Sequence, residues 1–598
     1  MAADFQLRTV LLSTLFFKCS GQFPKVCVSP ESLSSKECCP QPVGYDSKCG
    51  GPGRGACVDL SPPKADDSSQ FGGDLDRLAW PSTFFTRACK CDGNFDGYDC
   101  SQCKFGYKGT ECDKENRVTR RNILSMSQSE VKKFRSYLLN AKDKISDYQI
   151  ATSLYIDMLN GDNPLFNNVN EYDRFVWNHY YAARENIRRP AGVNDGSTII
   201  DFAHAGPAFL TWHRAYLLLF ERMIQQVNND DDFAIPYWDW SGAPNCEICT
   251  EEYMGENSPS PPHNILGEFS GWKDLCSDFQ RFHDIGLICS NVDNSNLPSI
   301  TRHPGSNKVL DELPSLDALY YTLSMTDYDT RPLVPTLNVS ISSHCSFRNI
   351  LEGFADSERQ TGLFAPFGLQ SQNRVHSYLN GTMGIVASSP NDPMFWLHHS
   401  NVDRIMEKWI RRYNVNTNHY PPKDSTPVGQ EADSYMVPFF PVMKNGEFLQ
   451  KSQVFGYTYD NVDSEGKPIS ALEKEREDQS IDRMQGCVLS PLDADLQLDL
   501  GIPEITAILN LKPWKALKMK NVNKNDGNDV FKTFNHPSAD QQHSDGARKP
   551  PTGTISVAVV VIVLLIASSA FISIKGRNVY HRYRGYQPIR EMDTDKKL

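Results

Sequence analysis

The sequence has no excess of positive charge. Its 598 residues include 61 lysines and arginines against 73 aspartates and glutamates, which gives a formal net charge of −12. Proteins that bind nucleic acids generally carry a basic surface, so this charge balance argues against a general nucleic-acid partner. The length exceeds that of one ordinary core and indicates two or more domains with additional segments.

Strand-like alternation of apolar and polar residues is rare between about 118 and 459. Segments with helical spacing replace it, among them 129–141 and 215–226. The second segment is apolar on most of its circumference, as expected for a helix buried in the middle of a larger domain. We therefore predict a mainly α domain over 119–460, with a four-helix bundle at its centre.

Long apolar runs without charge are also scarce. Residues 1–21 contain a short apolar core after Arg8, which is typical of a cleaved signal peptide. The uncharged run 554–574 is long enough to span a bilayer, and basic residues follow it at once, as the positive-inside rule requires. We expect a single-pass membrane protein with a lumenal body, a polar stalk over 461–553 and a cytoplasmic tail over 575–598.

The predicted tail contains Tyr586-Gln-Pro-Ile589. This pattern resembles the tyrosine-based signal that sorts membrane proteins to endosomes and related organelles. Tyr586 and Ile589 are then the positions that a sorting adaptor would bind. Four-residue matches of this kind also arise by chance, so the tail position is what favours the interpretation.

Cysteines are concentrated near the N-terminus. Seventeen occur in the chain, and sixteen remain once the one in the signal peptide is removed. Ten of them fall between Cys27 and Cys112, and a secreted chain keeps such cysteines as disulfides. We predict a stapled module over 22–118 that contains an EGF-like unit and has no chemistry of its own. The alternative is a zinc site. It conflicts with the oxidising environment of a secreted chain and with the irregular spacing of these cysteines.

Six further cysteines lie downstream. We expect disulfides rather than a redox or metal site at Cys246, Cys249, Cys276 and Cys289, and the sequence leaves open whether Cys345 pairs with Cys487. Two sequons, at Asn338 and Asn380, predict glycosylated surface sites.

Histidines occur inside the most aromatic and apolar segments of the predicted helical domain. His179 lies in Trp-Asn-His-Tyr-Tyr, and His204 and His213 are nine residues apart just ahead of the helical run at 215–226. Neutral imidazole is the commonest nitrogen ligand for copper and zinc, and a packed scaffold can direct several rings to one point. A single buried histidine is more often bonded to a backbone carbonyl, but the set favours a metal site.

These segments resemble the tyrosinase family, of the membrane-anchored pigment-cell type. The motifs are Asp-Phe-Ala-His204, Phe-Leu-Thr-Trp-His213-Arg, the Trp-Asn-His179 segment, and Asn-Asp-Pro-Met-Phe-Trp-Leu-His-His399, with similarity from about 22 to about 460. The resemblance implies two copper ions. It assigns His179, His204 and His213 to the first copper, CuA.

The second copper site, CuB, departs from the family pattern. The family has His-x-x-x-His on one helical face, whereas this chain has Gln372-Asn-Arg-Val-His376. His376 and His399 match the remaining CuB ligands, and Gln372 stands at the first ligand position. His398 precedes His399, and side chains of adjacent helical residues diverge by about 100°, so we interpret His398 as a neighbour rather than a substitute. Asp403, one turn after His399, is expected to orient that ring.

Further roles follow from the resemblance, residue by residue. Phe395 is expected to lie against a CuB histidine, and Val386 and Ser389 are expected to line the substrate entrance. Glu352 and Asn373 are expected to hold a water molecule that takes the proton of the phenol.

The implied activity is oxidation of monophenols such as L-tyrosine and o-diphenols such as L-DOPA by dioxygen, giving o-quinones for melanin in a melanosome or related organelle. Gln372 motivates an alternative: a tyrosinase-related protein with weak or absent oxidation, which acts as a tautomerase-like metalloprotein or as a non-catalytic partner of pigment enzymes.

Overall fold

The computed structural model describes most of the chain between residues 22 and 463. The described residues are 22–60, 75–152, 165–184, 201–277, 288–289, 297–306, 311–330, 346–353, 371–423, 426–463, 474–475 and 478. All belong to the first of two compact units, Met1–Lys518. Within these ranges no helix is long and apolar enough to cross a membrane. The predicted signal peptide, transmembrane segment and tail lie outside the described residues, as do Asn338, Cys345, Cys487, Tyr586 and Ile589.

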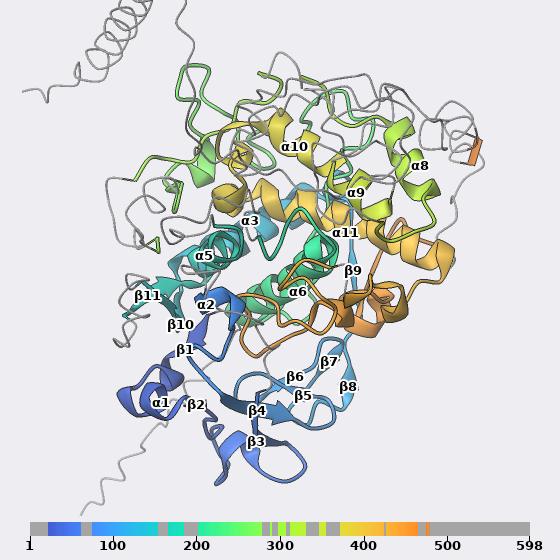
Figure 1. Cartoon of the computed structure of the whole chain (residues 1–598). Coiled ribbons are helices and arrows are strands. Elements are labelled where there is room, and N and C mark those ends of the chain that lie inside the picture. Colours follow the sequence, from blue (N-terminus) through green and yellow to red (C-terminus); the bar gives the residue numbers. More distant parts are fainter. Residues whose placement is uncertain are drawn as a thin grey trace, which may run out of the picture. The chain divides into compact units, whose positions relative to one another are not determined.

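Short strands and disulfides build the cysteine-rich region (Figure 1). One sheet has the order β2 (Glu37–Cys38), β4 (Arg87–Cys91), β3 (Gly55–Asp59), and two pairs follow, β5 (Phe95–Asp96) with β6 (Gln102–Cys103) and β7 (Tyr107–Lys108) with β8 (Lys114–Glu115). The helices are α1 (Pro30–Ser35) and α2 (Leu75–Leu78).

All ten cysteines of this region are paired, which confirms the predicted disulfides. The bonds are Cys27–Cys38, Cys39–Cys57, Cys49–Cys89, Cys91–Cys100 and Cys103–Cys112. Downstream, Cys246 pairs with Cys249 and Cys276 with Cys289. A sulfur in a disulfide offers no thiolate to a metal, so the zinc alternative is excluded for these cysteines.

The cysteine-rich region is joined to the helical region by direct contacts. The indole Nε1 of Trp80 donates to the Phe439 carbonyl at 3.2 Å, and Arg77 donates to the Ala182 carbonyl at 3.0 Å, at the end of α5. Phe23 packs in the same apolar core, with its ring centroid 5.4 Å from that of Phe440. The disulfide-rich region therefore supports the helices that carry the histidines.

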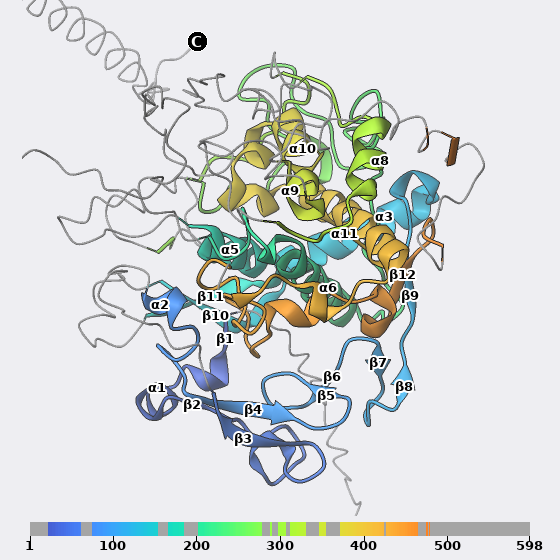
Figure 2. The same cartoon turned by 45° about the vertical axis from the view of Figure 1, so that its right-hand side comes forward.

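Four helices carry or face the predicted metal ligands: α5 (Glu171–Ala183), α6 (Ala208–Asn228), α10 (Ser371–Leu379) and α11 (Met394–Tyr413). Figures 1 and 2 show α6 and α11 side by side. Their seam contains the stacked rings of Phe220 and Trp396, whose centroids are 3.4 Å apart. Every residue of α5 is buried. Such burial was predicted for the run at 215–226, and residues 215–224 of α6 are buried as well.

Helix α6 begins earlier than the sequence pattern suggested. It starts at Ala208, directly after Pro207, so that His213 lies inside the helix instead of ahead of it. A proline fixes its own φ and needs no backbone donor at a helix start, which accounts for this boundary. At the other end Asn229 adopts the left-handed conformation that commonly terminates helices.

Short strands complete the helical region and were not predicted. β1 (Phe23–Pro24), β10 (Ile145–Ala151) and β11 (Phe166–Asn170) form one sheet, and β9 (Val118–Arg120) pairs in parallel with β12 (Tyr457–Tyr459). Strands this short carry too few residues to give a clear alternating pattern.

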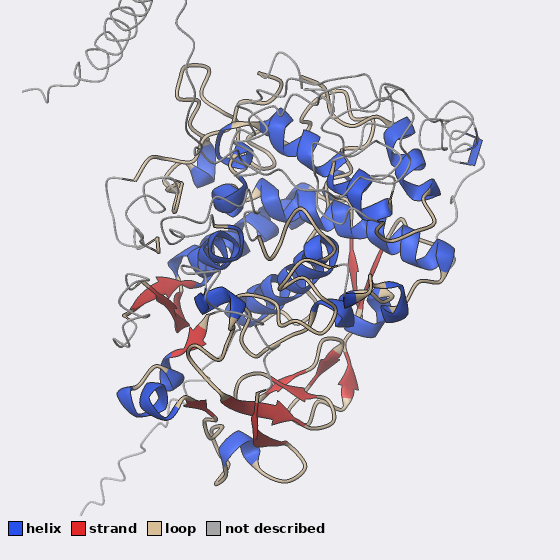
Figure 3. Cartoon of the chain, viewed as in Figure 1, coloured by secondary structure: helices blue, strands red, loops and turns tan. Residues whose placement is uncertain are grey.

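The remaining helices of the described residues pack against α5, α6, α10 and α11, and Figure 3 shows the helices in blue. They are α3 (Gln128–Asp143), α8 (Leu316–Ser324) and α9 (Phe347–Glu352). The 3₁₀ segments are Lys25–Cys27, Lys48–Gly50, Ile123–Ser125, Gly267–Phe269, Gly381–Gly384, Val386–Asn391, Thr417–His419, Asn445–Phe448 and Ser452–Phe455. Helix α3 confirms the helix expected at 129–141, and its start is fixed by a capping box between Ser127 and Glu130.

Candidate metal centre

Three histidines meet where α5, α6 and the loop before α6 converge. The ring centroids of His179 and His204 are 4.9 Å apart, those of His204 and His213 are 4.9 Å apart, and those of His179 and His213 are 5.6 Å apart. One nitrogen from each ring lies within 4.8 Å of the other two. The structure thus brings together the three residues that the sequence assigned to one metal. We call them the first cluster.

Each ring of the first cluster has a hydrogen-bond acceptor at Nδ1. His213 donates to the Phe209 carbonyl at 2.8 Å, His204 to the Asp201 carboxylate at 3.0 Å, and His179 to the Ala387 carbonyl at 3.3 Å. These oxygens cannot donate, so Nδ1 carries a proton in each ring, and Nε2 keeps its lone pair wherever the ring is neutral.

The Nε2 atoms of His179 and His213 are buried and have no hydrogen-bond partner among the described residues. A buried polar atom without a partner costs about 1–3 kcal/mol. A metal ion bound at these lone pairs would remove that cost, and the Nδ1 acceptors are the partners that orient metal-bound histidines.

Asp201 and the carbonyls of Phe209 and Ala387 were missed by the sequence analysis. Asp201 had a signal, since it stands three residues before His204 in Asp-Phe-Ala-His. The two carbonyls had no such signal, because every residue has a backbone carbonyl and the sequence does not mark which one accepts a hydrogen bond. The Ala387 carbonyl lies in the 3₁₀ segment Val386–Asn391, more than 200 residues from His179 in the chain.

The second cluster comprises His376 on α10 and His398 and His399 on α11. The Nε2 atoms of His376 and His399 are 3.4 Å apart. Two nitrogens bound to one metal at about 2.0 Å, with trigonal or tetrahedral angles, would be separated by roughly 3.3–3.5 Å. His376 donates from Nδ1 to the Met383 carbonyl at 2.8 Å, so its Nε2 is the free lone pair. The geometry therefore suits one metal ion between these two rings.

The two clusters are neighbours. The rings of His213 and His399 are stacked, with centroids 4.4 Å apart and planes 7° apart. Phe395 lies against both clusters, its ring centroid 4.1 Å from that of His399 and 5.2 Å from that of His179. The ring is thus where the sequence analysis expected it. Together the clusters form one centre with six imidazoles.

Burial sets the protonation of the centre. Desolvation lowers the pKa of His179, His213, His398 and His399 well below its ordinary value, and lowers that of His376 to about 4. Burial also works against the charged form of His204, but Asp201 outweighs it and raises the pKa of that ring. Five neutral rings near pH 7 offer lone pairs to a metal.

Gln372 lies on α10 one turn before His376, which places both on one helical face. It is buried, and its amide oxygen has no hydrogen-bond partner among the described residues. Asn373 is buried as well, and its Nδ2 has no such partner.

Glu352 is attached to the loop that carries His204. Its carboxylate accepts from the backbone N–H of Ala205 at 2.5 Å and from Arg348 at 2.9 Å. Ala205 has φ of 55°, a left-handed value that is uncommon outside glycine. Desolvation raises the pKa of Glu352 to about 7, although Arg348 opposes the rise. The carboxylate therefore holds the conformation of the loop next to His204.

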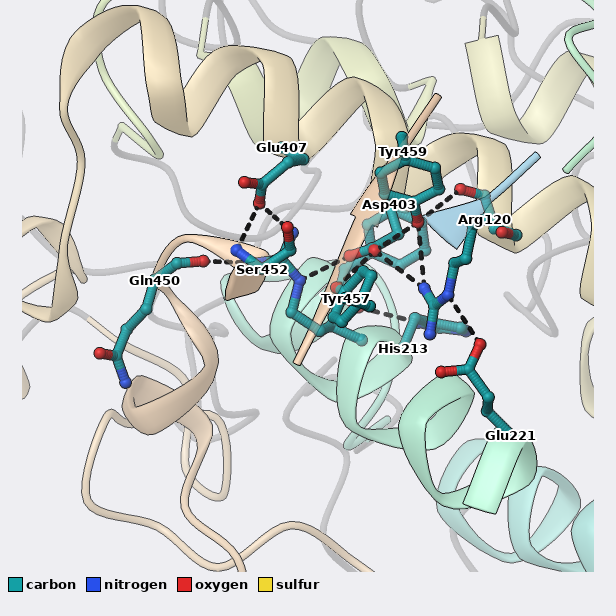
Figure 4. A network of polar contacts seen from close by, with 12 residues as sticks. Arg120, His213, Glu221, Asp403, Glu407, Gln450, Ser452, Tyr457 and Tyr459 are labelled. Atoms are coloured by element: carbon teal, nitrogen blue, oxygen red, sulfur yellow. Dashed lines mark hydrogen bonds and ion pairs between the residues drawn. The ribbon is translucent and has the colours of Figure 1, made fainter. Parts of the chain in front are cut away.

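Asp403 does not orient His399. Its carboxylate accepts instead from Arg214, from Arg120 at 3.2 Å, and from the hydroxyls of Tyr457 at 2.7 Å and Tyr459 at 2.6 Å, while Nδ1 of His399 has no hydrogen-bond partner among the described residues. Figure 4 shows Arg120, Tyr457 and Tyr459 gathered around Asp403. The expected contact with His399 is not made, because arginines from α6 and β9 and tyrosines from β12 donate hydrogen bonds to the carboxylate instead.

The Asp403 network joins the two clusters. Arg214, which also pairs with Glu407 at 3.2 Å, follows His213 directly on α6, and Asp403 is one turn beyond His399 on α11. Burial acts to raise the pKa of Asp403, but Arg214 and Arg120 outweigh it and leave that pKa below its ordinary value. An ionised carboxylate between two arginines thus locks α6 against α11 beside the centre.

The other predicted site residues lie as follows. Val386 and Ser389 are on the buried 3₁₀ segment that also offers the Ala387 carbonyl to His179. Asn380 is exposed, and its amide donates to the Ser306 hydroxyl at 2.9 Å.

Comparison with known proteins gives matches over both regions. Residues 169–412 match the common central domain of tyrosinase, and residues 65–117 match the laminin EGF domain. Tyrosinase of Felis catus is 43% identical over 458 residues, which cover 75% of this chain and 84% of that protein. Tyrosinase of Gallus gallus is 42% identical over 459 residues, with the same coverage. The 5,6-dihydroxyindole-2-carboxylic acid oxidase of Carassius auratus is 37% identical over 459 residues, covering 74% and 83%.

Proposed function

This chain belongs to the tyrosinase family, and from that premise we propose that it oxidises monophenols such as L-tyrosine and o-diphenols such as L-DOPA to o-quinones in melanin synthesis. The observation that carries the proposal is the adjacency of the two histidine clusters, in which the rings of His213 and His399 stack at 4.4 Å. A single metal would need only one cluster.

The donor set fits copper. The centre offers imidazole nitrogens, five of them on neutral rings, with no thiolate and no carboxylate among the clustered donors. Imidazole binds both Cu(I) and Cu(II), whereas oxygen ligands favour harder ions. We assign CuA to His179, His204 and His213, and CuB to His376 and His399, with Gln372 at the first ligand position of CuB in the family pattern. When bound, the copper pair supplies the binding and activation of dioxygen.

The protein's own residues position the substrate and its proton. Phe395 restricts the rings of His179 and His399 by packing against both. Val386 and Ser389 line the substrate entrance in this proposal, on the segment that also orients His179. Glu352 and Asn373 hold the water molecule that takes the proton of the phenol. The pKa of Glu352, at about 7, is suited to proton transfer near neutrality.

The architecture belongs to the same proposal. A catalytic domain over 119–460 with a central four-helix bundle follows the cysteine-rich region, and a stalk over 461–553 and a membrane span over 554–574 anchor it in a melanosome or related organelle. Asn338 and Asn380 carry glycans, and Tyr586 and Ile589 bind a sorting adaptor in the cytosol.

A second candidate function is favoured by Gln372. Loss of an imidazole at CuB would weaken copper binding and with it oxidase activity. The chain is also similar to 5,6-dihydroxyindole-2-carboxylic acid oxidase, a relative with a different substrate. In this alternative the chain is a tautomerase-like metalloprotein or a stabilising partner of pigment enzymes.

Metal analysis and substrate assays separate the two candidates. The full chain is purified in detergent, copper and zinc are counted per chain, and oxidation of L-tyrosine and L-DOPA is followed. We expect two coppers per chain and measurable oxidation of L-DOPA. Zinc in both sites, or copper without any oxidation of either substrate, would reject the oxidase in favour of the second candidate.

A further inference from the structure

His398 is a buried histidine on α11 whose polar atoms are unsatisfied. Its side chain is fully enclosed, and both of its ring nitrogens lack a hydrogen-bond partner among the described residues. A neutral imidazole has one donor and one acceptor, and each left unpaired in a protein interior costs about 1–3 kcal/mol. Such a ring needs an explanation that packing alone does not give.

The ring of His398 lies close to the other two histidines of the second cluster. Its centroid is 4.8 Å from that of His376 and 4.9 Å from that of His399, so His376 lies closer to His398 than to His399, from which it is 5.5 Å. One nitrogen from each of the three rings lies within 4.8 Å of the other two. Successive side chains on a helix diverge by about 100°, yet His376 on the opposing helix is near enough to meet both.

The divergence of the two α11 rings gives them different neighbours. His399 is directed to the first cluster, where it stacks on His213 at 4.4 Å. His398 is directed to the Trp240 side, with ring centroids 5.9 Å apart, and the indole Nε1 of Trp240 also has no hydrogen-bond partner among the described residues. The indole therefore does not satisfy His398, although it is an aromatic donor on that side.

Gln372 leaves the second metal one imidazole short. A Gln amide oxygen is a neutral, hard donor that suits Cu(I) less well than imidazole does. The second cluster nevertheless contains three imidazoles, those of His376, His398 and His399.

We propose that His398 supplies the third nitrogen to the second copper of this chain, in place of the histidine that Gln372 replaces. The inference rests on the proposed function, because it takes the metal at this cluster to be copper. It reverses the interpretation of His398 as a mere neighbour. Its nitrogen lies within 4.8 Å of the other two, so reaching a spacing of roughly 3.3–3.5 Å on one metal needs a shift of at most about 1.5 Å, within the reach of a ring rotation.

The test compares three variants of the full chain. His398→Phe removes the nitrogen and keeps a planar ring. Gln372→Ala removes the amide. The double variant Gln372→His/His398→Phe moves the imidazole to the family position on α10. The readouts are copper per chain, Cu(I) affinity by competition with a chelator, and the number of imidazoles per copper from X-ray absorption.

We expect the parent chain to hold two coppers with an average of about three imidazoles each. His398→Phe should weaken the second copper by at least about 10–100-fold, since changes that merely reorient a ligand already cost that much. Gln372→Ala should weaken it less than His398→Phe does. The double variant should regain the affinity that the single variant lost.

A matched control is His303→Phe, which replaces a histidine outside both clusters that stacks on His263 at 3.7 Å. It should keep both coppers.

The inference is overturned if His398→Phe keeps the parental affinity and imidazole number, or if the folded double variant fails to recover the copper. If His398→Phe does not fold, the imidazole number of the parent decides: an average near 2.5 per copper overturns the inference. A parent chain without copper would overturn the proposed function as well, whereas two coppers with an unchanged His398→Phe would overturn this inference alone.

Discussion

The two histidine clusters differ in how their rings are held. In the first cluster each of the three rings donates from Nδ1 to a protein oxygen. In the second, His376 alone does so, while His399 lacks a partner at Nδ1 and His398 lacks one at both nitrogens among the described residues. Hydrogen bonds therefore arrange the first cluster in advance, whereas the second is arranged by packing and has more to gain from a metal.

This difference predicts different responses to damage. A site whose ligands are already oriented loses affinity when an orienting partner is removed. A site whose ligands are held by packing responds instead to the number of donors within reach. The predictions that follow separate these two behaviours.

The largest effect is expected from His213→Ala. The substitution removes one of three ligands of the first cluster and the ring that stacks on His399. We expect loss of the first copper and a fall in L-DOPA oxidation of at least about 100-fold, since losing a ligand should exceed the loss of an orienting partner. Copper per chain and turnover are measured beside His303→Ala. Parental oxidation by His213→Ala would rule out the two-copper site.

Asp403→Asn should destabilise the whole chain without selecting a cluster. The carboxylate is buried between Arg214 and Arg120, and removing its charge leaves Arg214 only Glu407 and Arg120 only Glu221 as a carboxylate partner. Breaking a buried ion pair typically costs about 3–5 kcal/mol. The free energy of unfolding is measured on the full chain in detergent, where Asp403→Asn should unfold at clearly lower denaturant.

The control for Asp403 is Asp433→Asn. Asp433 pairs with Lys423 at 3.3 Å at the surface, where both side chains are more than half exposed. Surface pairs contribute about 0–1 kcal/mol, so this variant should unfold like the parent. Equal effects of the two substitutions would show that the Asp403 network does not lock α6 against α11.

Asp201→Ala should damage the first cluster alone. Asp201 accepts the Nδ1 proton of His204 and raises the pKa of that ring, so its removal frees the ring to rotate and lowers the pKa. We expect the affinity of the first copper to fall by about 10–100-fold while that of the second is unchanged. Stepwise titration with Cu(I) measures both affinities. A parallel loss at both sites would mean that the clusters are not independently oriented.

The residues that could be predicted from the sequence were those whose chemistry is visible in their type. Five histidines in aromatic segments pointed to the centre, and ten crowded cysteines pointed to the disulfides. Asp403 was misjudged because its real donors include Arg120, 283 residues away, and a local helical spacing cannot show such a partner. His398 and His399 do diverge along α11, as helical spacing predicts, but their distances to His376 depend on how α10 packs against α11 and cannot be predicted from spacing within one helix.

The smallest effect is expected from Gln372→His, which restores the family pattern on α10. The new imidazole would stand on the same helical face as His376, where the buried amide oxygen now has no partner among the described residues. A softer donor should raise copper content and L-DOPA oxidation. With His398 already serving as the third nitrogen, we expect a gain of less than about 10-fold, whereas a second copper held by only two imidazoles would gain at least about 10–100-fold. Copper per chain and kcat for L-DOPA and L-tyrosine measure the gain. If the variant and the parent bind copper equally and turn over alike, position 372 lies beyond reach of the second copper, and this face of α10 contributes His376 alone to the metal centre.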